Sequence, residues 1–76
     1  RMKEYETVWE IFNECANIFF NDTATAEIYT DDPEKFVLDK FKGKEVSYEK
    51  SVLPDGSIVF DIMTSGIRQR YTFTEI

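Results

Sequence analysis

The stretch EYETVWEIFNECANIFF, which spans residues 4–20, decides the fold that this sequence predicts. Its apolar side chains recur every three or four residues, and at about 100° per residue they fill one arc slightly wider than half of a helical wheel. The apolar arc contains Tyr5, Val8, Trp9, Phe12, Ala16 and Phe19, and the polar arc contains Glu6, Thr7, Glu10, Asn13, Glu14 and Asn17. We therefore expect an amphipathic helix over this stretch, ended by Asn21 and Asp22, which favour caps and turns.

A short strand and a second helix are expected next. Residues 23–30, TATAEIYT, are rich in Thr, Ile and Tyr and predict a strand. Asp32 is a good N-cap, Pro33 suits the first helical position and Gly43 suits a left-handed stop, so the sequence predicts a helix of about ten residues between them. A helix this short depends on tertiary packing for its stability. Its expected buried face consists of Phe36, Val37 and Phe41, with Leu38 at the edge.

The rest of the chain predicts three antiparallel strands. Apolar and polar residues alternate over residues 44–53, 58–63 and 67–76. The turn sequences PDGS (54–57) and TSG (64–66) separate these runs, and their Pro, Asp and Gly residues suit tight reversals of the backbone. Three strands joined by two short turns form a meander.

The element order α-β-α-β-β-β predicts a single small α+β domain over residues 1–76, with two helices packed on one face of a mostly antiparallel four-stranded sheet. The place of the 23–30 strand in that sheet stays open. Arg1 directly precedes Met2, which indicates a residue added in front of a natural start, and we leave it out of the functional argument. The expected core face of the sheet carries Val46, Tyr48, Val52, Ile58, Phe60, Ile62, Tyr71 and Phe73. The opposite face carries Glu45, Ser47, Glu49, Val59, Asp61, Met63, Arg68, Arg70 and Thr72.

Composition narrows the classes of protein. The formal net charge is −6, and residues 1–34 hold nine acidic and two basic residues, so the acidity belongs to the N-terminal half. Seven Phe, four Tyr and one Trp argue against disorder. One cysteine excludes an internal disulfide framework, and no apolar run approaches the roughly 20 residues of a membrane span, so we expect a cytoplasmic protein. Without histidine, the His-containing zinc sites and His-based catalysis are excluded, and no cofactor is expected.

The first candidate site is an acidic ridge on the expected first helix. Glu6, Glu10 and Glu14 follow one another at four-residue spacing, with Ile11 and Ile18 at the apolar margin. Like charges at this spacing repel each other, and a basic protein partner, or the basic groove of a nucleic-acid-binding protein, would relieve the repulsion. The alternative is a solvated face that keeps a small protein soluble. Carboxylates on successive turns splay apart, so no metal site is expected here.

The second candidate site is the pair Arg68 and Arg70 on the last strand. Both point the same way and could clamp an anion or carboxylate. Alternatively, they pair across strands with Asp61 and with Glu45 or Glu49. The aromatic residues of this strand point to the core instead, so direct binding of nucleic acid is not expected.

The remaining features favour structural roles. Cys15 shares the apolar arc of the expected helix and has no nearby base, which indicates a core residue rather than a nucleophile. Apolar residues at the helix margin, together with Val59 and Met63, exceed what one short second helix can cover, and self-association as a homodimer would bury them. The sequence thus predicts a small acidic non-enzymatic protein, a protein–protein interaction or inhibitor module. The alternative is a small-ligand or anion-binding regulatory domain that uses Arg68 and Arg70.

Overall fold

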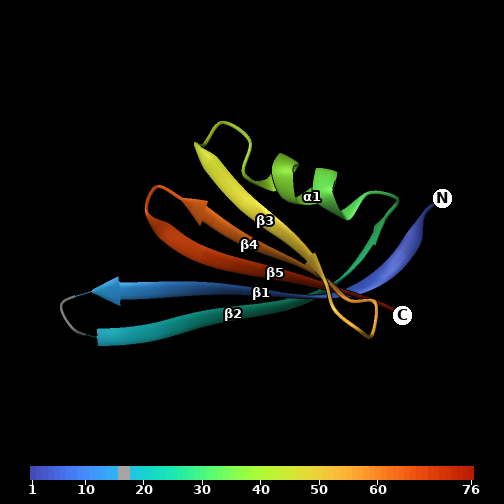
Figure 1. Ribbon diagram of the computed structural model, residues 1–76, viewed down its shortest axis with the longest axis horizontal. Coiled ribbons are helices and arrows are strands. Elements are labelled where there is room, and N and C mark those ends of the chain that lie inside the picture. Colours follow the sequence, from blue (N-terminus) through green and yellow to red (C-terminus); the bar gives the residue numbers. More distant parts are fainter. Residues whose placement is uncertain (16–17) are drawn as a thin grey trace.

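The computed structural model describes residues 1–15 and 18–76, and the side chains of residues 1–12 and 22–76. It forms a five-stranded antiparallel sheet with a short helix against one face (Figure 1). The elements are β1 (Lys3–Cys15), β2 (Ile18–Thr30), α1 (Pro33–Lys40), β3 (Val46–Val52), β4 (Ile58–Thr64) and β5 (Ile67–Glu75). The strand order across the sheet is β2-β1-β5-β4-β3, so the N-terminal strand lies inside the sheet and β2 forms one edge.

The prediction of a helix over residues 4–20 is wrong. Residues 4–15 of this stretch lie in β1 and residues 18–20 lie in β2. The two strands pair antiparallel, with Tyr5 opposite Ile28 and Trp9 opposite Ala24. The stretch is rich in aromatic and β-branched residues, which lose side-chain freedom in a helix and pack well on a pleated sheet. The two-helix, four-stranded arrangement is therefore wrong as well: the described elements are five strands and one helix.

The second half of the chain follows the prediction closely. β3, β4 and β5 form the expected meander, and α1 begins at Pro33 with Asp32 as its N-cap. The Asp32 carboxylate accepts a hydrogen bond from the backbone N–H of Lys35 at 3.2 Å, which satisfies one free donor of the first turn. Gly43, in the left-handed region at φ +85°, reverses the chain after α1.

The core lies between α1 and the sheet. Its fully buried side chains include Phe60 and Phe73, both with 0% exposure, and Val37 with 1%. Phe73 packs edge-to-face on Phe60 and on Tyr5, with ring centroids 5.8 and 5.7 Å apart. Because Phe73, Phe60 and Tyr5 come from β5, β4 and β1, this cluster joins the β1–β2 pair to the meander.

A polar chain lies beside this core on the same face of the sheet. The Trp9 indole N–H donates to Gln69 Oε1 at 2.9 Å, and Gln69 Nε2 donates to Thr64 Oγ1 at 2.7 Å. Gln69 and Thr64 are buried, at 7% and 4% exposure, so these hydrogen bonds replace those that water would otherwise make. Nearby, the Lys40 ammonium lies 4.2 Å from the centre of the Trp9 ring and ties the end of α1 to β1.

Alkaline pH is expected to destabilise the fold through Tyr71. Burial raises the pKa of the Tyr71 phenol above its ordinary value of 10.0. The folded state thus favours the neutral phenol. The contribution of the neutral phenol to stability is complete below pH 10, the pKa in the unfolded chain, and is lost as the pH rises through the raised pKa of the folded state. In urea unfolding measured from pH 8 to pH 11, Tyr71→Phe should show a smaller fall in the free energy of unfolding than the unchanged protein. Equal falls in both proteins would contradict this assignment.

Candidate functional site

No helix of the described residues covers the face of the sheet opposite α1, and the side chains of that face alternate with the core residues along each strand. We call it the open face. Among the described side chains it bears Glu4, Glu6, Val8, Glu10 and Phe12 from β1, Thr23, Thr25, Glu27 and Tyr29 from β2, Ser47, Glu49 and Ser51 from β3, Val59, Asp61 and Met63 from β4, and Arg68, Arg70, Thr72 and Thr74 from β5.

The predicted acidic ridge is dispersed by the change from helix to strand. Glu6 and Glu10 share the open face, but residues four apart on a strand are about 13 Å apart, against about 6 Å on a helix. Ile11 lies on the opposite face, in register with Gln69. The side chains of Glu14 and Ile18 lie outside the described residues, as does that of Cys15.

A different pair of carboxylates does meet on the open face. Glu6 of β1 lies directly opposite Glu27 of β2, and like charges directly opposite one another destabilise a sheet. Neither makes an ion pair with any side chain that the structure describes. Together with Thr25 and Ala26 they line a shallow hollow of about 390 Å³. The sequence alone does not predict this pair, because the pair depends on the register between two strands.

The interpretation of Arg70 as a cross-strand partner is confirmed. Its Nε atom donates to Asp61 Oδ1 at 2.9 Å, and the two residues are in register on β5 and β4. Arg68 makes no ion pair with the described side chains. Both guanidinium groups lie near the Phe12 ring, 5.5 Å from its centre for Arg68 and 5.8 Å for Arg70. Phe12 therefore packs beneath two cations rather than in the core.

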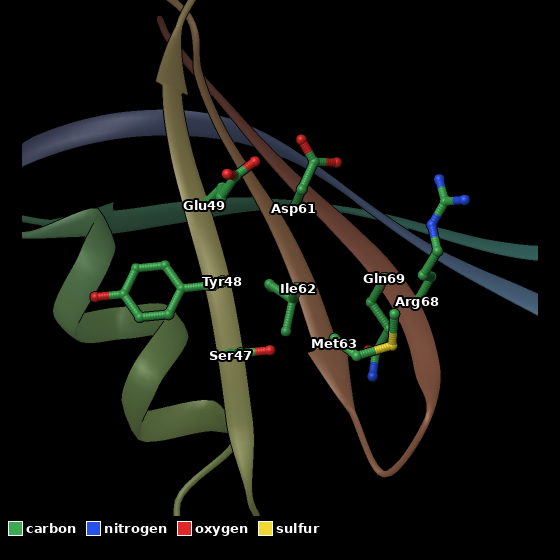
Figure 2. Close-up of a pocket in the computed structure, with 8 residues that line it drawn as sticks. All are labelled: Ser47, Tyr48, Glu49, Asp61, Ile62, Met63, Arg68 and Gln69. Atoms are coloured by element: carbon green, nitrogen blue, oxygen red, sulfur yellow. The ribbon is translucent and has the colours of Figure 1, made fainter.

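A cavity of about 250 Å³ opens between β3, β4 and β5 (Figure 2). Its lining residues are Ser47, Tyr48, Glu49, Asp61, Ile62, Met63, Arg68 and Gln69. Glu49 and Asp61 project from neighbouring strands, whereas the Tyr48 ring turns to the helix side, where its hydroxyl donates to the Glu34 carboxylate. That hydrogen bond raises the pKa of Tyr48. Two carboxylates and Arg68 thus share this cavity, which gives it charges of both signs.

The edge strand β2 directs half of its backbone hydrogen-bonding groups away from the sheet. The backbone hydrogen bond from Ile76 N–H to Glu4 O shows that even-numbered residues of β1 bond to β5. The odd-numbered residues of β1 therefore bond to even-numbered residues of β2, and the odd-numbered residues of β2 direct their N–H and C=O groups outward. The outward residues with described side chains are Thr23, Thr25, Glu27 and Tyr29, all of them exposed.

The two edges of the sheet differ in how they are protected from further pairing. β2 has 13 residues and pairs with β1 in an unbroken register without a bulge. It contains no Pro, Lys or Arg, and its charged residues are Asp22 and Glu27. β3 has seven residues and carries Lys50, whose ammonium group lies 3.7 Å from the Glu34 carboxylate of α1. Natural edge strands usually have such protection. The absence of Pro, Lys and Arg is visible in the sequence TATAEIYT (23–30). Its meaning was not evident there, because only the strand order shows that this segment lies at an edge of the sheet.

Within the described ranges, no three Cys, Asp or Glu side chains converge where they could hold a metal ion. No helix among these residues has the length and apolar character needed to cross a membrane. No protein-family model matches the chain, and comparisons with curated proteins and with solved structures find no match to it.

Proposed function

We propose that this chain is a small non-enzymatic protein-interaction module that binds its partner by adding a strand to the β2 edge. The observation that carries the proposal is the long, regular β2 strand, whose outward backbone groups face solvent without proline, lysine or a bulge. A partner strand would satisfy these N–H and C=O groups and extend the sheet. An inhibitor that covers its target in this way is one form of the same module.

The chemistry of the open face also favours binding over catalysis. Its Asp61 carboxylate is held by Arg70, and the chain has no histidine to act as a general base near neutral pH. The exposed Glu6 and Glu27 lie in a shallow hollow open to solvent, where a carboxylate gains little catalytic power. These carboxylates are therefore better suited to a binding surface than to catalysis.

Blocking the β2 edge at one backbone group tests the proposal. The N–H of Thr25 points outward, so Thr25→Pro removes a donor from the edge and none from the β1–β2 pairing. Thr25→Val is the matched control, since it keeps the N–H and the β propensity. In affinity capture with quantitative mass spectrometry, proteins retained by the unchanged chain and by Thr25→Val should be lost with Thr25→Pro. Equal capture by Thr25→Pro, shown to be folded by circular dichroism, would overturn the proposal.

Anion binding at Arg68 is a second candidate function. It is favoured because Arg68 lines a cavity and makes no ion pair with a described side chain. Glu49 and Asp61 line the same cavity and oppose an anion, so we place it second. If Arg68 binds anions, inorganic phosphate should raise the melting temperature of the protein, and Arg68→Gln should abolish that rise.

A further inference from the structure

The β2 edge is bordered by acidic side chains. Between Asp22 and Thr30 the strand carries Asp22 and Glu27 and no basic residue, and Asp31 and Asp32 follow it directly. Glu6 lies opposite Glu27 on β1. The neighbouring cation, Lys3, is 3.4 Å from the Glu75 carboxylate and is already paired. Any strand that adds to this edge therefore enters a region of negative charge.

We propose that the strand accepted by β2 is an extended basic segment of a partner protein, with a Lys or Arg directly opposite Glu27. This inference rests on the strand addition proposed above and specifies the chemistry of the partner. The edge itself carries the site, because its backbone groups provide the hydrogen bonds. The carboxylates decide the sign of charge that fits beside them.

The position opposite Glu27 is defined by the pairing geometry. Glu27 directs its backbone groups outward and its side chain onto the open face, so a partner residue that pairs with it also directs its side chain onto the open face. Side chains of directly opposed residues start about 5 Å apart. A long Lys or Arg side chain at that position reaches Glu27, and beyond it Glu6, and so relieves the repulsion between these two carboxylates.

A second copy of this chain fits the same edge less well. A two-fold pairing of β2 with β2 centred on Thr25 places Glu27 opposite Thr23 of the copy and Asp22 opposite Ile28. That pairing supplies no cation to Glu27 and Glu6, and it brings two chains of net charge −6 together along their acidic halves. Charge complementarity therefore favours a basic partner over self-pairing.

The test uses a synthetic fluorescent peptide of eight residues in which Lys alternates with Val, measured by fluorescence anisotropy against the intact chain. A second peptide has Glu in place of every Lys. The Lys peptide should bind and the Glu peptide should not, and the Kd of the Lys peptide should rise with salt. The double variant Glu6→Gln/Glu27→Gln should weaken binding about five- to tenfold. Glu45→Gln/Glu49→Gln removes the same charge at the far edge and should change the Kd less than twofold.

The outcomes separate this inference from the proposed function. If both peptides bind equally and Thr25→Pro blocks both, strand addition stands and the basic partner is wrong. If the Lys peptide binds Thr25→Pro as tightly as it binds the unchanged chain, strand addition at β2 is wrong, and the basic partner strand is wrong as well. If the two double variants lose affinity for the Lys peptide equally, net charge alone attracts the peptide, and the assignment of a cation opposite Glu27 is wrong. A mass of two chains in light scattering, lost in Thr25→Pro, would identify a second copy as the occupant.

Discussion

Phe73→Ala is expected to lower the free energy of unfolding by about 3–5 kcal/mol, the range typical of a phenylalanine removed from a packed core. The Phe73 side chain is fully buried and contacts rings from three other elements: Tyr5 of β1, Phe36 of α1 and Phe60 of β4. Its loss leaves a cavity at the point where the β1–β2 pair, the helix and the meander meet. Domains have total stabilities of about 5–15 kcal/mol, so this single change would remove a large fraction of the total.

Urea denaturation measures this effect, with the fluorescence of Trp9, the single tryptophan, as the probe. Phe73→Leu keeps most of the volume and should cost clearly less than Phe73→Ala. Tyr29→Ala removes a ring that is 64% exposed and should change stability by less than about 1 kcal/mol. A loss below about 1 kcal/mol for Phe73→Ala would contradict the central position given to this residue.

Local signals predicted most of the second half of the chain correctly. The exceptions are Val52, expected in the core but 65% exposed, and Val59, expected on the solvent face but only 8% exposed. Asp32 and Pro33 mark the start of α1, and both the cap and the helix are found where they were expected. Gly56 and Gly66 lie in turns with φ +88° and +78°, a conformation that glycine adopts without strain. Strand alternation then placed Phe60, Tyr71 and Phe73 in the core and paired Asp61 with Arg70. Each of these inferences depends on residues close together in sequence.

The strand predicted over residues 23–30 is confirmed as part of β2. Residues 4–20 could not be assigned correctly from local signals, because their apolar residues satisfy two periods. Tyr5, Val8, Trp9 and Phe12 match a helix, yet Tyr5 and Trp9 also alternate with the glutamates at positions 4, 6 and 10, as in a strand. Residue type was the deciding signal, since Val, Ile, Thr and aromatic residues favour strands. The repulsion expected between glutamates on successive helical turns pointed the same way.

The candidate site was harder to predict than the fold. Once the strands are known, alternation shows that Glu6, Glu10 and Arg70 lie on the same face of the sheet. That Glu6 lies opposite Glu27 can be known only from the register between β1 and β2. The exposed edge requires the strand order of the whole sheet, in which β1 pairs with β5 across more than 50 residues of sequence. Non-local pairing of this kind leaves little trace in any short window of sequence.

Gln69→Leu is expected to lower the free energy of unfolding by about 1–3 kcal/mol, although leucine has nearly the same size. Gln69 accepts from the Trp9 indole and donates to Thr64, and its removal leaves both partners without a hydrogen bond in a largely buried place. Leaving a buried polar group without a partner costs more than the hydrogen bond itself contributes. The effect is therefore larger than that of an ordinary change of one polar side chain.

A double-mutant cycle with Trp9→Phe isolates this hydrogen bond. Phenylalanine keeps an aromatic ring against Tyr71, whose ring stacks on Trp9 at 6.0 Å, but removes the N–H donor. Once the donor is gone, Gln69→Leu should cost less, so the two losses should fall short of additivity by about 0.5–2 kcal/mol. Thermal unfolding by circular dichroism is the readout, because the variant lacks tryptophan. Strict additivity would contradict a stabilising contribution from this hydrogen bond, which joins residues 60 positions apart in the sequence.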